Sequence, residues 1–284
     1  MVLVNWRTPD MTLQAVERAL NQSLRPARVY VVDNGSGDGS AERLGQGLSV
    51  HGQQVALVAH SRNDGFGAGN NLAMQRILDA SEADFIWLLN NDAVPAPDCL
   101  QRLVAAASAA PGPVGIVGSL LVDPDDDVPP HFGSWLNPVT LSTGVVSPSS
   151  PIDRHPFGWM TAASMLVSVA ALRAVGLFDP RFFMYWEDAD LNMRIRQAGF
   201  LILGAADARV EHHAGTSSAA IPVQRYLWHL ASEDRFIHKH HPLPGPARVA
   251  LRARFLAKAI LDRDLPRVRA ILRAAFERTD APAR

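Results

Sequence analysis

Cysteine is nearly absent from this sequence of 284 residues, in which Cys99 stands alone. A single cysteine excludes an intramolecular disulfide and a thiolate-rich metal site, and it makes the cytoplasm the default location. No apolar run reaches the roughly 18 residues of a membrane-spanning helix, and the first residues lack the charged start and cleavage site of a signal peptide. We therefore expect any membrane contact to be peripheral.

An excess of either charge is also missing. The 27 Lys and Arg residues nearly balance 28 Asp and Glu residues, which gives a formal net charge of -1. Such a balance argues against a dedicated nucleic-acid binder. The chain is long enough for one large α/β domain or two small ones with a sizeable core. Its function therefore has to be inferred from local motifs.

An apolar stretch at residues 85–89 does not alternate with polar residues, which predicts a central strand covered on both faces. Asn90, Asn91 and Asp92 follow at its carboxyl end, the edge where open α/β sheets bind ligands. The prolines in residues 93–97 are expected to take the chain out of the sheet. A carboxylate at this edge suits Mg²⁺ or Mn²⁺, whereas an Asx turn or the N-cap of a following helix explains the same triplet.

Predicted strands and helices alternate through about residue 120. The strands are expected at residues 2–6, 28–32, 55–59 and 114–118, and the helices at residues 12–20, 72–78 and 99–110. This alternation is typical of a parallel sheet in which a nucleotide binds. Asp33, at the end of the second strand, is placed to accept hydrogen bonds from a base or ribose, and residues 33–40 also fit a tight turn.

Three glycines, Gly65, Gly67 and Gly69, precede the helix expected at residues 72–78. They would let backbone N–H groups approach a phosphate or ribose closely, and ordinary loop punctuation explains them equally well. A dinucleotide-binding fingerprint follows the first strand and has Gly-x-Gly-x-x-Gly spacing. These glycines meet neither condition, so the pattern does not indicate an NAD site.

Residues 123–157 are rich in proline and serine. We expect a loop-rich insertion there, with a hairpin at residues 131–146, because such insertions commonly carry contacts with an acceptor or a partner. Beyond it we predict a strand at residues 165–167 and a helix at residues 169–175 that ends at Gly176.

A second polar group follows the aromatic run at residues 182–186. Glu187, Asp188 and Asp190 fall in or just before the first turn of a predicted helix, where the helix dipole favours carboxylates. Aromatic walls can desolvate a carboxylate and raise its basicity, whereas simple capping of the helix is the structural alternative. Asp190 and Arg194 have the spacing of an i,i+4 ion pair.

The last predicted strand begins at residues 201–203 and leads through residues 208–210 to His212 and His213. A neutral imidazole at a strand end can complete a metal site begun by Asp92. An exposed histidine pair without a function is the alternative.

The tail is predicted to be helical at residues 225–241 and 247–276, with a break at Pro266. From Arg248 onward it holds ten Lys or Arg residues, interleaved with apolar ones. This pattern fits an amphipathic helix that rests on anionic lipid, or a packed helix with a solvated face.

Four segments together resemble the family 2 inverting glycosyltransferases. They are Val2-Leu3-Val4-Asn5-Trp6, residues 31–40, residues 63–71 and Trp186-Glu187-Asp188-Ala189-Asp190-Leu191. The resemblance covers residues 1–240 and is strongest to the rhamnosyltransferase-like branch that builds bacterial cell-wall and O-antigen glycans. It implies the GT-A fold, an α/β fold with a mostly parallel central sheet flanked by helices, followed here by a helical C-terminal extension.

The resemblance also implies a division of the chain. Residues 1–240 would form the glycosyltransferase domain, with a nucleotide-binding half at 1–120 and an acceptor-binding and catalytic half at 121–240. Residues 241–284 would form the basic helical extension.

Site residues follow from the resemblance position by position. The donor would contact Asn5, Asp33, Asn34, Ser36, Asn63, Gly65, Phe66, Gly67, Asn70, Asn71 and Asn91. Asp188 would be the general base with Glu187 beside it, and Tyr185 and Trp186 would contact the acceptor. Asp92 and His212, with His213 not excluded, would hold Mg²⁺ or Mn²⁺. Asn90 replaces the first acid of the family's Asp-x-Asp motif, so metal binding would rest on fewer charges than usual.

The activity implied is the inverting transfer of a sugar, with L-rhamnose from dTDP-rhamnose as the first expectation, to a hydroxyl of a glycan or lipid-linked glycan. It would proceed by metal-assisted single displacement, in the cytoplasm or on the inner face of the cytoplasmic membrane, with membrane contact through the C-terminal helices. Two other classes of protein fit the sequence less well. A sugar-nucleotide pyrophosphorylase would have a glycine-rich basic loop where Arg7-Thr8-Pro9-Asp10 stands, and a non-catalytic binding module would have no need of Asp92, Asp188 and a strand-end histidine together.

Overall fold

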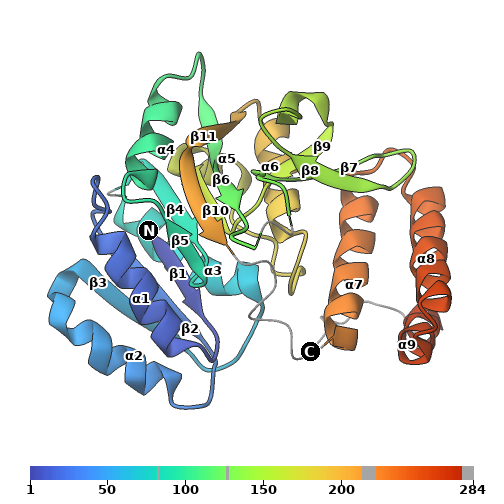
Figure 1. Cartoon of the computed structure of the whole chain (residues 1–284), viewed down its shortest axis with the longest axis horizontal. Coiled ribbons are helices and arrows are strands. Elements are labelled where there is room, and N and C mark those ends of the chain that lie inside the picture. Colours follow the sequence, from blue (N-terminus) through green and yellow to red (C-terminus); the bar gives the residue numbers. More distant parts are fainter. Residues whose placement is uncertain (82, 126–127, 213–221, 277–284) are drawn as a thin grey trace.

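A large mixed sheet lies at the centre of the molecule, with helices packed on both faces (Figure 1). The structure is a computed structural model that describes residues 1–81, 83–125, 128–212 and 222–276. Within these residues the sheet has eight strands, in the order β3-β2-β1-β4-β10-β6-β11-β5. Their bounds are β1 Val2–Asn5, β2 Val29–Asn34, β3 Val55–His60, β4 Phe85–Leu89, β5 Ala93–Pro95, β6 Val114–Val122, β10 Ser164–Ser168 and β11 Leu201–His212.

The strands β3, β2, β1 and β4 pair in parallel, and so do β6 and β11. This confirms the predicted strands and the mostly parallel sheet. Strand β6 does not lie beside β4, however, because β10 returns from the insertion and runs antiparallel between the two. The alternation of strands and helices along the sequence gives no spatial order, so this placement was not predicted.

The short strand β5 corrects one expectation. Residues 93–97 were expected to leave the sheet, but Ala93–Pro95 pairs antiparallel with β11 at the edge of the same sheet. An edge strand tolerates Pro95, since an edge residue can turn its unpaired side to solvent and needs no ladder hydrogen bond there. The pairing sets His212 opposite Ala93, next to Asp92 in the chain.

Each face of the sheet has its own apolar cluster. Helices α1 Pro9–Leu20, α2 Ser40–Leu48 and α4 Cys99–Ser108 cover one face, and helices α3 Phe66–Ala80, α5 Val169–Val175 and α6 Glu187–Gln197 cover the other. In β4, Trp87 and Leu89 pack into the first cluster, whereas Ile86 and Leu88 pack into the second. The unalternating apolar stretch is therefore buried on both faces, as predicted.

A second, three-stranded sheet is formed by the insertion. Its strands are β7 Gly133–Leu136, β8 Thr143–Val146 and β9 Phe157–Met160, in the order β8-β7-β9. The antiparallel pair of β7 and β8 confirms the predicted hairpin. Strand β9 packs on α6, so the insertion is fixed to the helix that carries the acidic cluster.

Three helices follow β11 and stand beside the sheet (Figure 1). They are α7 Pro222–His240, α8 Pro244–Leu261 and α9 Leu265–Phe276, and Pro266 lies in the first turn of the last one. The buried Phe236, Ile237, Leu251 and Phe255 belong to one apolar cluster that joins α7 and α8 to the aromatic residues before α6. Among the described helices, none combines the length and the apolar content required to span a membrane.

Candidate active site

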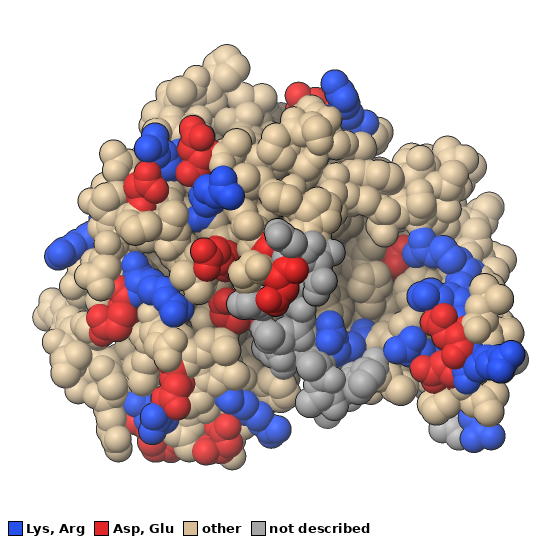
Figure 2. Space-filling model, viewed as in Figure 1, with Lys and Arg blue, Asp and Glu red and all other residues tan. Residues whose placement is uncertain are grey.

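A cavity of 520 Å³ lies between the carboxyl edge of the sheet and α7. Figure 2 shows the molecule hollowed between the sheet and the C-terminal helices. Ten of the predicted site residues line this cavity: Asn34, Asn63, Phe66, Asn91, Asp92, Tyr185, Trp186, Glu187, Asp188 and His212. Segments from both halves of the chain therefore meet in one site.

A hydrogen-bond network lies behind the cavity wall. Asp33 Oδ1 accepts from Asn5 Nδ2 at 2.7 Å and from the Ser36 hydroxyl at 2.5 Å, and all three residues are buried. Thr12 Oγ1 donates to Asn5 Oδ1 at 2.9 Å, and Asn91 Nδ2 donates to Thr12 Oγ1 at 2.8 Å. The network connects the ends of β1 and β2 to a cavity residue. Direct donor contacts of Asn5, Asp33 and Ser36 stay predictions.

The glycine-rich segment lets α3 pack closely against the aromatic run. Gly65 has φ +94° and ψ 170°, and a Cβ atom there would overlap the backbone of Phe183. The Phe66 amide donates to the Phe183 carbonyl at 3.0 Å. Asn70 and Asn71 donate to the carbonyls of Phe66 and Phe178. These glycines serve packing, and the donor contacts predicted for Gly65, Gly67, Asn70 and Asn71 remain untested.

Asp92 and His212 are the candidate metal ligands, and the structure brings them together. His212 Nε2 lies 3.3 Å from Asp92 Oδ1, and both residues line the cavity. Within the described chain, His212 Nε2 is buried and has no hydrogen-bond partner. A carboxylate oxygen and an imidazole nitrogen fit Mn²⁺ or Mg²⁺ as a partial ligand set. No group of three or more His, Cys, Asp or Glu side chains is placed to hold a metal ion in the described residues.

His213, the other candidate from the sequence, lies outside the described residues. Asn90 lines the cavity beside Asp92, as its position in the motif predicts.

Glu187 and Asp188 begin α6 and also line the cavity. Asp188 accepts from the backbone amides of Ala189 at 2.8 Å and Ala162 at 3.2 Å. Burial raises the pKa of Asp188, although these amides oppose the shift. Burial and then the charge of Asp188 raise the pKa of Glu187 well above its ordinary value. The two backbone amides favour the ionised form of Asp188, whereas burial and the adjacent charge of Asp188 disfavour ionisation of Glu187.

The backbone before these acids is strained. Tyr185 and Trp186 have φ values of +68° and +67°, a region that bulky residues rarely occupy. The ring of Trp186 packs 4.9 Å from Trp159 and 5.0 Å from Phe236, and the Tyr185 hydroxyl accepts from Arg225 Nε at 3.2 Å. Packing therefore holds the turn that aims Glu187 and Asp188 into the cavity.

One wall of the cavity was missed by the sequence analysis. Arg225, Trp228 and His229 of α7 line it. Their i, i+3, i+4 spacing marks one face of a helix, which is a usable signal. Nothing in the sequence, however, indicates which face of α7 turns toward the sheet.

Comparison with known proteins agrees with this geometry. Residues 2–166 match the protein family described as Glycosyl transferase family 2. The chain is 29% identical over 271 residues to the N-acetylglucosaminyl-diphospho-decaprenol L-rhamnosyltransferase of Mycobacterium tuberculosis (strain ATCC 25618 / H37Rv), covering 84% of this chain and 86% of that protein. It is 25% identical over 187 residues to the rhamnosyltransferase WbbL of Escherichia coli (strain K12), covering 61% and 70%.

The fold is similar to that of solved glycosyltransferases. The mannosyltransferase PcManGT from Pyrobaculum calidifontis, in complex with GDP-Man and Mn²⁺, superposes with a TM-score of 0.60 at 16% identity, covering 96% of this chain and 78% of that one. This likeness confirms the GT-A fold that the sequence motifs imply.

Proposed function

This chain belongs to glycosyl transferase family 2, and on that premise we propose that it moves a sugar from a nucleoside-diphosphate donor to a hydroxyl of a glycan or lipid-linked glycan. The observation that carries the proposal is the shared cavity, which Asp188 and Glu187 line together with the strand-edge pair Asp92 and His212. The named relatives favour L-rhamnose as the sugar and a lipid diphosphate as the acceptor carrier. The family match disfavours a non-catalytic module.

Asp188 is the proposed general base of a single displacement. The acceptor hydroxyl transfers its proton to Asp188 as its oxygen attacks the anomeric carbon of the sugar, and the nucleoside diphosphate departs from the other side with inversion. A raised pKa makes Asp188 a stronger base, and the neighbouring neutral carboxyl of Glu187 avoids a second buried negative charge.

Asp92 and His212 are the proposed residues that hold Mg²⁺ or Mn²⁺. When bound, the ion would neutralise charge on the diphosphate leaving group. With two protein ligands, the remaining positions would be left to water and to diphosphate oxygens, which is the usual arrangement for Mg²⁺ in nucleotide sites. Asn34, Asn63 and Asn91 also line the cavity and are proposed to contact the donor.

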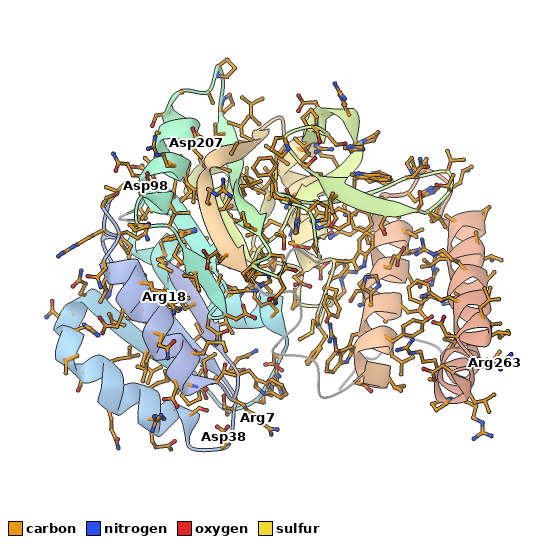
Figure 3. The ribbon with its side chains drawn as sticks, in the orientation of Figure 1. Arg7, Arg18, Asp38, Asp98, Asp207 and Arg263 are labelled. Carbon is orange, nitrogen blue, oxygen red and sulfur yellow. The ribbon has the colours of Figure 1, made fainter. Side chains whose placement is uncertain are left out.

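We also propose that α8 and α9 rest on anionic lipid at the inner face of the cytoplasmic membrane. Val249, Ile260, Leu261, Leu265 and Leu272 are exposed large apolar side chains of these helices. Figure 2 shows Lys and Arg side chains over the same helices, with Asp and Glu side chains among them, and Figure 3 places Arg263 at their outer edge. Exposed aliphatic residues beside cations suit an anionic membrane surface.

A thermal-shift panel tests the transferase proposal. The protein is heated with dTDP, UDP, GDP or NAD, each with and without Mn²⁺. A ligand at one hundred times its dissociation constant stabilises the fold by about 2.7 kcal/mol, which is easily seen. A metal-dependent shift with one nucleoside diphosphate, followed by turnover of the matching sugar donor, supports the proposal. A protein that responds to none of the diphosphates contradicts it.

A further inference from the structure

One cationic side chain enters the cavity from α7. Among the described lining residues, Arg225 is the sole Lys or Arg, and the acidic side chains that line the cavity with it are those of Asp92, Asp123, Glu187 and Asp188. Arg225 is therefore the one guanidinium in a described lining that is otherwise acidic, polar or apolar.

Arg225 is a half-buried residue, and its guanidinium forms no ion pair with a carboxylate of the described residues. Neighbouring arginines of the C-terminal helices are paired: Arg248 with Asp234 at 2.6 Å and Arg254 with Glu233 at 2.7 Å. A guanidinium withdrawn from water without a counter-ion is unfavourable unless a ligand supplies one.

Tyr185 fixes the orientation of this guanidinium. Arg225 Nε donates to the Tyr185 hydroxyl at 3.2 Å, which occupies one of the five N–H donors of the side chain. The remaining donors lie in one plane and match two oxygens of a phosphate, a geometry that arginine provides and lysine does not.

A second donor on the same face of α7 lacks a partner among the described residues. Trp228 stands three residues after Arg225 and packs against Phe183 with ring centroids 4.7 Å apart and the rings tilted by 40°. Its indole Nε1 is buried, and within the described chain it donates no hydrogen bond. Because buried donors in folded proteins are nearly always satisfied, an unsatisfied one in a cavity wall points to a ligand atom.

We propose that Arg225, with Trp228 Nε1 as a second donor, binds a phosphate group of the acceptor substrate. The inference rests on the proposed function, which assigns the strand-edge wall at Asp92 to the diphosphate of the donor. An anion on the α7 wall then belongs to the other substrate. The acceptor is thereby assigned to a class: a sugar carried on a phosphate or diphosphate, whose hydroxyl points toward Asp188.

A binding experiment tests Arg225 without turnover. Inorganic pyrophosphate is titrated by calorimetry into the full chain in metal-free buffer that contains EDTA. Arg225→Gln should weaken binding about tenfold or more, the effect of losing a charged hydrogen-bond pair, and Arg225→Lys should weaken it less. The control Arg76→Gln removes an exposed arginine of α3 and should bind as wild type does. Equal binding by Arg225→Gln, or none by the wild type, overturns the proposal.

Kinetics then distinguish acceptor from donor. One acceptor sugar is offered on a short polyprenyl diphosphate and on an alkyl glycoside without phosphate. Arg225→Gln should raise KM about tenfold or more for the diphosphate acceptor alone, with the donor KM unchanged. A raised donor KM with an unchanged acceptor KM overturns the assignment. Tyr185→Phe keeps the guanidinium but removes its hydrogen bond to Tyr185. If Tyr185→Phe raises the acceptor KM as much as Arg225→Gln does, the role of Arg225 is to position Tyr185 and not to bind phosphate.

The two proposals can fail separately. If the wild type transfers sugar to no acceptor, the proposed function fails, whereas the pyrophosphate titration still decides whether Arg225 binds phosphate.

Discussion

Asp188 and Glu187 are adjacent carboxyls with different proposed roles, and one amide substitution at each position separates them. Asp188→Asn removes the base but keeps the size of the side chain, so we expect kcat to fall about 10³-fold while donor binding stays nearly unchanged. The measurement pairs initial rates with a titration of the nucleoside diphosphate. Loss of donor binding in Asp188→Asn would instead make Asp188 part of the donor pocket.

The pH dependence of the rate offers a second test at this pair. Because only ionised Asp188 accepts a proton, we expect kcat to rise with pH through its raised pKa and then to level off. Glu187→Gln resembles the protonated Glu187, so its rate should fall far less than that of Asp188→Asn and its ascending limb should stay close to that of wild type. If the rise of kcat with pH disappears in Glu187→Gln, Glu187 is the titrating base.

Individual residues were predictable where a strand end fixes their place. Asp92 follows the buried strand β4 and His212 is the last residue of β11, and strand ends of one sheet meet at a common edge, so their proximity could be expected. Asp33 also follows a strand, but its carboxylate turns inward to Asn5 and Ser36, which only the folded backbone reveals. Arg225 and Trp228 could not be assigned, because they reach the cavity from a helix whose orientation depends on distant packing.

Among the elements, α3 depends on one glycine. Gly65→Ala places a Cβ against the Phe183 backbone and forces a φ and ψ combination that is essentially restricted to glycine. We expect a loss of about 3 kcal/mol or more of unfolding free energy, measured by urea denaturation.

Gly39 provides the matched control for that substitution. Its φ of +88° is similar, but a Cβ there meets nothing within 4 Å. Gly39→Ala should therefore lose only about 1 kcal/mol. Equal losses in the two variants would show that backbone strain alone, without the contact to Phe183, accounts for the need for Gly65.

Asp190 joins α6 to α7. The predicted pair with Arg194 is present at 2.8 Å, and Lys239 at 2.6 Å and His240 at 2.8 Å also contact this buried carboxylate. Burial alone would raise the pKa of Asp190, but the hydrogen bond from His240 and the nearby cations hold it below its ordinary value. Asp190→Asn leaves these cations buried without their counter-ion, so we expect a loss of about 3 kcal/mol in urea denaturation at pH 7.

The sign of the pH effect follows from the lowered pKa. Asp190 contributes its stabilisation above the pKa of an unfolded aspartate, about 4, and loses it as the pH falls through the lower folded value. The difference between wild type and Asp190→Asn should therefore shrink in acid. Asp98→Asn, which breaks an exposed pair with Arg102 at the start of α4 (Figure 3), should cause no measurable change at either pH. A difference that does not shrink as the pH is lowered below about 4 would contradict the ionic explanation.

Elements with a strong periodic pattern were predicted well, and those that depend on distant packing were not. Helix α2 was missed because Gly45 and Gly47 lower its helix propensity. In the structure, a Cβ at Gly47 would press on the side chain of Leu13, so this glycine allows α1 and α2 to approach closely. Gly47 thus lowers the helix propensity of the isolated segment but allows the helix to pack in the folded protein.

At the scale of the whole molecule, the membrane proposal can be tested without truncation. Removing residues 246–284 would expose the α7 surface that Leu251 and Phe255 cover, so a point change is the sharper test. Ile260→Glu with Leu261→Glu puts two charges on the exposed face of α8. We expect binding to phosphatidylglycerol vesicles to fall about tenfold or more, measured by sedimentation.

Val50→Glu, at a 79% exposed position outside these helices, is the control. If the double variant binds vesicles as well as wild type does, this face of α8 does not contact lipid.

The two walls of the cavity come from different stretches of the chain, because the strand-edge residues Asp92 and His212 lie at or before the end of β11 and the α7 wall follows it. Because of this division, the preference for the donor and the preference for the acceptor can change independently. A chimera that takes residues 222–276 from a relative should acquire that relative's acceptor while keeping its own donor, so that new glycan linkages can arise by recombination of gene segments instead of by gradual reshaping of one pocket.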